Sequence, residues 1–175
     1  MQVVPDIVVL IGMPGCGKST AGRLLARKLN REFIDTDDLI RGQIGMTFDE
    51  YINAEGAEAF AREERSVLMN FNPTGKVVAA TGGSAVLYDD AMRHLKSIGT
   101  LVFIDMDLPR LKKRIRNFDS RGIIGGNGKA SLNLLDVYKE REPLYYRYAD
   151  VRVFLTGEDK NGARDLIYNS LIGKS

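Results

Sequence analysis

Residues 8–22 read VVLIGMPGCGKSTAG: a mostly β-branched run gives way to a loop with three glycines, a proline and a Lys-Ser pair. The loop satisfies the pattern G-x-x-x-x-G-K-[ST] and lies between a predicted strand and a predicted helix, as that pattern requires. In such a loop backbone N–H groups surround an anion, the lysine reaches the β- and γ-phosphates, and the serine hydroxyl can ligate Mg²⁺. The stretch therefore predicts a nucleoside triphosphate site that includes Gly15, Cys16, Gly17, Lys18, Ser19 and Thr20.

A plain glycine turn between strand and helix is the alternative interpretation of this loop. Such a turn would explain neither Lys18 nor the spacing of the glycines. Cys16 invites comparison with a catalytic nucleophile, but no histidine is close to it in the sequence. We expect Cys16 to be a small residue that fills the loop.

The composition is that of an ordinary globular protein. The chain has 175 residues, 44% of them hydrophobic and 27% charged, which suits one domain over 1–175 that needs no partner for stability. The net charge of +2 is too small to indicate a nucleic-acid or membrane partner. We expect a monomer that acts on a small molecule.

One cysteine and one histidine argue against an internal disulfide and against a zinc site. The first residues, MQVVPDIVVLIG, have no basic segment before the apolar run and no apolar run of membrane-spanning length. They predict a first strand and neither a signal peptide nor a membrane span. We expect a cytoplasmic protein.

Strand-like runs alternate with helical stretches along the chain. DIVVLIG, KVVAATGG, TLVFIDMD and the shorter VRVFLTG are predicted strands, and FIDTDD is a short second strand that ends in acids. TFDEYINAEGAEAFAREERSVLMNF predicts a pair of helices interrupted near Gly56, and DLPRLKKRIRNF a further, basic helix. The alternation indicates an α/β fold with a parallel sheet covered on both faces. The Gly-rich segment at about 118–133 predicts a mobile lid.

Asp35 and Asp37 follow the predicted second strand, at the sheet edge where open α/β sheets bind ligands. Residues two apart on an extended backbone point the same way, so both carboxylates can face one cleft. One would lie near Mg²⁺, and the other would hold an acceptor hydroxyl and take its proton. The alternative is that DTDD only caps the following helix, a role that Asp38 or Thr36 could fill.

A glycine pair and two arginines complete the candidate site. Gly82 and Gly83 end a predicted strand at the same sheet edge and would allow a ligand to approach the backbone, although a plain turn is the alternative. Arg121 lies in the Gly-rich segment, where closure would bring it over the transferring phosphate. Arg141 lies in a helical segment suited to a fixed carboxylate. Taken singly, each arginine would more often be a solvated surface charge, so the prediction depends on their positions beside Gly-rich and aromatic segments.

Together these features resemble the shikimate kinase family, over nearly the whole chain. The motifs that carry the resemblance occur in order: GMPGCGKSTAGRLLARKL, FIDTDDLI, GMTFDEYINAEGAEAFAREE, ATGGSAV, SRGII and EREPLYYRYAD. The resemblance implies a three-layer α/β/α P-loop fold with a central five-stranded parallel sheet, a helical substrate-binding segment at about 35–65, and a lid. It implies phosphorylation of the 3-hydroxyl of shikimate by ATP with Mg²⁺, in aromatic amino-acid biosynthesis.

The resemblance also implies roles for single residues. Phosphates would lie on the backbone of Gly15 and Gly17 and on Lys18. Carried over motif by motif, the remaining roles are Ser19 and Asp35 for Mg²⁺, Asp37 for the acceptor hydroxyls and as base, Gly82 and Gly83 for the acceptor pocket, Arg141 for its carboxylate, Arg121 for the lid, and Arg114 for stacking on adenine.

Three departures affect the acceptor half. The family helix GE-x-x-FR-x-x-E has a carboxylate-binding arginine where this chain has Ala61, and an acid where it has Ala57. The family's third glycine is Ser84, and its lid motif RPLL is RGII. Loss of one of two carboxylate-binding arginines should cost about 2–4 kcal/mol of acceptor binding unless another base compensates. Arg62, Arg65 and Arg93 are candidates for that compensation.

The departures leave two alternatives to shikimate phosphorylation. The acceptor could be another small hydroxy acid or polyol, such as a gluconate-like sugar acid, although FIDTDD lacks the histidine usual in gluconate kinases. The chain could also be a nucleotide-binding regulatory module that no longer transfers phosphate. The acceptor-facing Asp37 argues against the second alternative, because a switch has no need of it.

Overall fold

The computed structural model describes residues 3–115 and 133–173, and within them it contains a five-stranded parallel sheet. The strands are β1 (Ile7–Ile11), β2 (Glu32–Asp35), β3 (Val77–Ala80), β4 (Thr100–Asp105) and β5 (Val151–Phe154), in the order β2-β3-β1-β4-β5. Every neighbouring pair is parallel, with Val8 opposite Val78 and Thr100. The α/β class and the parallel sheet predicted from the sequence are confirmed.

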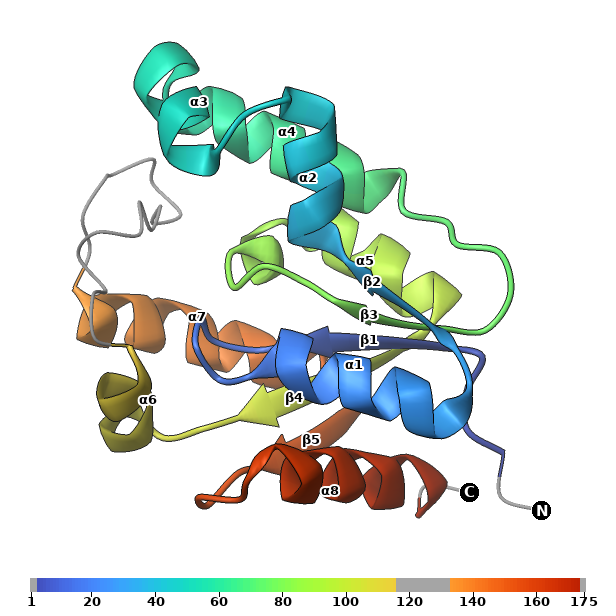
Figure 1. Cartoon of the computed structure of the whole chain (residues 1–175). Coiled ribbons are helices and arrows are strands. Elements are labelled where there is room, and N and C mark those ends of the chain that lie inside the picture. Colours follow the sequence, from blue (N-terminus) through green and yellow to red (C-terminus); the bar gives the residue numbers. More distant parts are fainter. Residues whose placement is uncertain (1–2, 116–132, 174–175) are drawn as a thin grey trace.

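Helices cover both faces of this sheet (Figure 1). α1 (Lys18–Leu29) and α8 (Lys160–Ile172) pack side by side on one face, and α5 (Asp89–Ile98) and α7 (Leu134–Tyr148) lie on the other. The short α6 (Leu108–Arg114) follows β4. The inner strands β1, β3 and β4 read as continuous apolar runs because both their faces are covered, whereas the edge strands β2 and β5 keep exposed side chains. Val8, Val9, Leu10, Val78 and Ala79 are fully buried.

Three helices stand apart from these layers, above the sheet in Figure 1: α2 (Thr36–Ile44), α3 (Phe48–Glu55) and α4 (Ala57–Met69). They share a small apolar cluster of their own, formed by Ile40, Phe60 and Val67 with Phe48 and Tyr51 packed against it. The predicted break between α3 and α4 is confirmed at Gly56, whose φ of 89° lies in the region that favours glycine.

One local prediction needs correction. The FIDTDD segment is not extended throughout, because β2 ends at Asp35 and Thr36 already begins α2. The cap of that helix is neither Asp38 nor Thr36: the Asp35 side chain accepts a hydrogen bond from the Asp37 N–H at 3.1 Å. A carboxylate is a favourable cap because it satisfies a free N–H and meets the positive end of the helix. Asp37 therefore projects from the first turn of a helix.

No helix among the described residues is long and apolar enough to span a membrane. The predicted lid and its Arg121 lie outside the described residues, apart from residue 133 at the edge of that range.

Candidate active site

The phosphate loop lies between β1 and α1, as predicted. Gly15 and Gly17 have φ of 78° and 97°, values that side-chain-bearing residues rarely adopt, so the glycine spacing is a requirement of the turn. Gly17 is also the cap residue of α1 and has no side chain with which to satisfy the first N–H groups of that helix. These donors are directed toward the loop and suit an anion.

Lys18 is buried, and its side chain folds back along the phosphate loop, so that its ammonium group contacts the loop backbone. Its Nζ donates to the carbonyl oxygens of Gly12 at 2.8 Å and Met13 at 2.9 Å. Cys16 is also fully buried, and a Cβ on Gly12 would come within 3.0 Å of its Sγ. The expectation that Cys16 fills the loop is confirmed, since its thiol has no access to a substrate.

Ser19 and Asp35 join the phosphate loop to the end of β2. The Ser19 Oγ donates to Asp35 Oδ2 at 2.7 Å, while Oδ1 of the same carboxylate caps α2. A hydroxyl and a carboxylate are hard oxygen ligands of the kind that Mg²⁺ takes together with substrate phosphates. The described residues contain no cluster of three or more His, Cys, Asp or Glu that could bind a metal alone. These two residues fit a magnesium ion that is also bound to nucleotide.

Asp37 lies against the glycine pair that follows β3. A Cβ on Gly82 would be 2.8 Å from Asp37 Oδ1 and 3.1 Å from Glu64 Oε1, so glycine is required here by two carboxylates. Burial raises the pKa of Asp37, and the charge of Asp35 acts in the same direction, while Lys18 and Arg41 oppose the shift. A carboxylate with a raised pKa is a better proton acceptor for a hydroxyl.

Glu64 on α4 is a member of this site that the sequence reasoning did not single out. It is buried, and its carboxylate accepts from Ser84 Oγ at 2.6 and 2.9 Å and from the Tyr88 hydroxyl at 2.8 Å. Burial raises the pKa of Glu64 although both hydrogen bonds lower it, and the charges of Asp37 and Arg141 also act on it. The available signal was its position as the final acid of GE-x-x-FR-x-x-E.

Arg141 lies on α7 and is almost completely buried, with 1% of its surface exposed. The structure brings it to the acceptor side, where its charge acts on Glu64 and Tyr88 and its side chain hydrogen-bonds with Tyr145. The Tyr145 hydroxyl donates in turn to the Gly83 carbonyl oxygen at 2.6 Å. The buried network of α7 thus holds the glycine pair in place.

Two of the three candidate substitutes for the arginine missing at Ala61 are engaged elsewhere. Arg65 forms a two-pronged pair with Asp90, its Nε 3.0 Å from each oxygen, and Arg93 pairs with Asp89 at 2.7 Å. Both are exposed, and neither acts on the pKa of Asp37 or Glu64. Arg62 is exposed on α4, where its charge acts on Tyr51. The structure therefore brings none of the three to the acceptor side.

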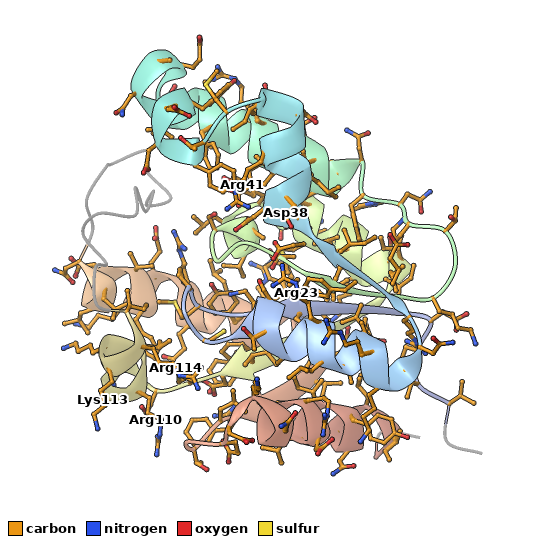
Figure 2. All side chains as sticks on the ribbon, in the orientation of Figure 1. Arg23, Asp38, Arg41, Arg110, Lys113 and Arg114 are labelled. Atoms are coloured by element: carbon orange, nitrogen blue, oxygen red, sulfur yellow. The ribbon has the colours of Figure 1, made fainter. Side chains whose placement is uncertain are left out.

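Arg114 ends α6 beside the phosphate loop, and Figure 2 shows its side chain on the α1 side of that helix. Its Nη1 is 3.4 Å from the Cys16 carbonyl oxygen. Arg114, Gly17 and Thr20 line a cavity of about 150 Å³ together with residues that were not predicted to take part: Leu155 after β5, and Asp159, Lys160 and Ala163 around the start of α8. The cavity adjoins the phosphate loop, since Cys16 and Gly17 also line it.

Comparison with known proteins agrees with this geometry. The family model described as shikimate kinase matches residues 14–170. A shikimate kinase of Chromohalobacter salexigens is 34% identical over 175 residues, covering 100% of this chain and 94% of its own. Human threonine synthase-like 1 is 32% identical over 166 residues, which are 94% of this chain but only 22% of that protein.

Among solved structures, the shikimate kinase of Acinetobacter baumannii in complex with shikimate superposes with a TM-score of 0.84 at 29% identity, covering 99% of this chain and 96% of that one. The shikimate kinase of Aquifex aeolicus gives a TM-score of 0.78 at 28% identity, with coverages of 96% and 97%. The match extends over both the nucleotide and the acceptor halves. The chain belongs to the shikimate kinase family.

Proposed function

We propose that this chain transfers the γ-phosphoryl group of ATP to the 3-hydroxyl of shikimate, giving shikimate 3-phosphate and ADP. The observation that carries the proposal is the connection from Ser19 through the Asp35 carboxylate to the first turn of α2, where Asp37 lies beside Gly82. Asp35, a candidate magnesium ligand, and Asp37, the candidate base, thus lie two residues apart where β2 ends and α2 begins. The shikimate complex of the Acinetobacter baumannii relative supports the choice of acceptor.

In the proposed reaction the acceptor oxygen attacks the γ-phosphorus, and the bond from that phosphorus to the oxygen bridging it to the β-phosphate breaks. The proton of the hydroxyl passes to Asp37, whose buried carboxylate has a raised pKa and so holds a proton more readily than an exposed one. The Lys18 ammonium group, which donates to the carbonyl oxygens of Gly12 and Met13, would stabilise the charge that develops on the phosphate oxygens.

Magnesium would be held by Ser19 and Asp35, and it supplies neutralisation of the phosphate charge when bound. Arg121 would add a positive charge from the lid, and Arg114 would lie against the adenine, as the family resemblance implies. Arg141, which lies on α7, would bind the carboxylate of the acceptor. The segment at about 35–65 would then close one side of the acceptor, with Gly82 and Gly83 on the other.

The test is coupled ATP turnover with shikimate in the wild type and in Asp37→Asn. We expect shikimate-dependent ADP release in the wild type and a loss of about 10²–10⁴-fold in kcat for the variant. Nucleotide affinity should stay within about twofold. Asp38→Asn, at the exposed neighbour of Asp37, is the matched control and should keep the wild-type kcat. A folded, ATP-binding wild type with no shikimate stimulation would refute the proposal.

A second candidate acceptor is another small hydroxy acid or polyol, which the alanine at position 61 favours. A thermal-shift panel with an ATP analogue, shikimate, gluconate and nucleoside monophosphates separates the candidates. A true acceptor at 100 times its Kd adds about 2.7 kcal/mol of stability. Stabilisation by gluconate and none by shikimate would favour the second candidate.

A further inference from the structure

Two acids, Asp37 and Glu64, lie on the acceptor side of the site, where Lys18 acts on the first and Arg141 on the second. Asp37 and Glu64 flank Gly82, and the Arg141 guanidinium is the buried cation that acts on Glu64. An acceptor with a carboxylate of its own would be repelled by two acids unless a second cation lies nearby. Position 61, where the family motif has that second cation, is alanine.

Arg41 is a cation on the helix that carries Asp37. The two residues are four apart on α2, so their side chains lie on one face of the helix, one turn from each other. The charge of Arg41 acts on the Asp37 carboxylate and lowers its pKa. In Figure 2 the Arg41 side chain extends from α2 toward the side on which α3 lies, with Asp38 beside it.

A continuous aromatic contact links Arg41 to the neighbourhood of Ala61. The Arg41 guanidinium lies 4.8 Å from the centroid of the Phe48 ring, and that ring packs on Phe60 with centroids 4.8 Å apart. Phe60 directly precedes Ala61 on α4 and belongs to the apolar cluster shared by α2, α3 and α4. Arg41 is therefore connected through Phe48 to Phe60, the residue that precedes Ala61 on α4.

The Arg41 side chain can exchange its present partner at little cost. Its Nη1 pairs with Asp38 Oδ1 at 2.8 Å, but the two side chains are 51% and 62% exposed. Ion pairs as exposed as this contribute about 0–1 kcal/mol. A ligand carboxylate that meets the planar guanidinium with two hydrogen bonds, away from bulk water, offers a stronger interaction.

We propose that Arg41 binds the carboxylate of the acceptor together with Arg141, and so replaces the cation lost at position 61. The inference rests on the proposed function and names the substrate class of that site: a hydroxylated carboxylic acid. The small side chain at Ala61 leaves room on α4, and the cation comes from α2 instead. Arg41 is then a specificity-determining residue that acts on binding and leaves the chemistry to Asp37.

The experiment compares Arg41→Gln with the wild type, using shikimate and its uncharged methyl ester, on the pH plateau of each enzyme. We expect the KM for shikimate to rise at least about tenfold in the variant, while kcat and the KM for ATP change less than about threefold. We expect the KM for the ester to be high in the wild type and the same in both enzymes. Arg62→Gln, on the exposed side of α4, should leave every constant unchanged.

A second variant tests the replacement directly. Ala61→Arg in the Arg41→Gln background should restore most of the lost affinity for shikimate, because it returns a guanidinium to α4 at the position where the family motif has one. If shikimate is turned over and Arg41→Gln leaves its KM unchanged, or raises the KM for acid and ester alike, the inference about Arg41 is overturned and the proposed function stands. If the folded wild type neither binds nor phosphorylates shikimate, both are overturned.

Discussion

Glu64 is a carboxylate in an unusual environment for an acid, almost fully enclosed by the protein. Its side chain is buried beneath the acceptor site, where two hydroxyls donate to it and Asp37 lies close by. Burial outweighs the hydrogen bonds, so the pKa in the folded protein is raised above that in the unfolded chain. Between those two pKa values the folded state binds more protons than the unfolded one. The free energy of unfolding therefore falls as pH rises through that window.

Glu64→Gln should remove the part of the fall in the free energy of unfolding with rising pH that the Glu64 carboxylate causes. The free energy of unfolding of the variant minus that of the wild type should grow more positive as pH rises above about 4.5, by up to about 1.4 kcal/mol per pH unit inside the window. Urea denaturation at a series of pH values measures it. Ser84→Ala removes a hydrogen bond that lowers the pKa of Glu64, so the pKa should rise further. The fall in the free energy of unfolding should then continue to higher pH. A pH-independent difference for Glu64→Gln would contradict the assignment.

Among the elements, the loops after β1 and β3 contact each other at Gly83, where any side chain would clash with Pro14. A Cβ on Gly83 would lie 2.5 Å from Cδ and 3.0 Å from the backbone nitrogen of Pro14, in the phosphate loop. Tyr145 on α7 donates to the Gly83 carbonyl oxygen and fixes the second loop from behind. The nucleotide loop and the acceptor loop are therefore positioned by a direct glycine–proline contact.

Gly83→Ala should displace the phosphate loop. We expect a loss of about 1–3 kcal/mol in the free energy of unfolding, as for other overpacked sites, with weaker binding of an ATP analogue by calorimetry. Gly42→Ala is the matched control, since nothing lies within 4 Å of its added Cβ in α2. That change should stabilise the protein by about 0.5–1 kcal/mol. Wild-type stability and nucleotide affinity in Gly83→Ala would show that the contact can relax freely.

At the scale of the whole molecule, strand order brings the two half-sites together. β1 lies next to β3, and β3 next to β2, all parallel. The phosphate loop, Gly82 and Asp35 consequently emerge at the same carboxyl edge, in agreement with the general rule for open α/β sheets. Under the proposed function, the nucleotide and the acceptor would meet there from different loops and would have separate binding sites.

Separate sites predict additive stabilisation. An ATP analogue at 100 times its Kd should raise the free energy of unfolding by about 2.7 kcal/mol, and saturation with shikimate to the same degree should add about 2.7 kcal/mol more. Chemical denaturation with each ligand alone and with both measures the increments. A combined increment no larger than that of one ligand would mean that the two compete for one site.

Much of the fold and of the nucleotide site could be predicted from local sequence alone. The phosphate loop is determined by glycines at positions of positive φ and by the adjacent Lys-Ser pair, all within eight residues. The fully buried strands can be recognised in the sequence as apolar runs, and the break between α3 and α4 can be recognised from Gly56. The end of β2 could not be predicted in this way, because Asp35 both ends that strand and caps α2.

The sequence by itself determined the class of this protein, because a loop that binds phosphate depends on backbone conformation and on close neighbours in the chain. Only the tertiary structure decided the acceptor side. Asp37, Glu64, Ser84 and Arg141 come from four separate segments, and burial between them, which no local pattern contains, raises the pKa of the two acids. Likewise, Arg41 is connected to α4 only because Phe48 of α3 packs between it and Phe60.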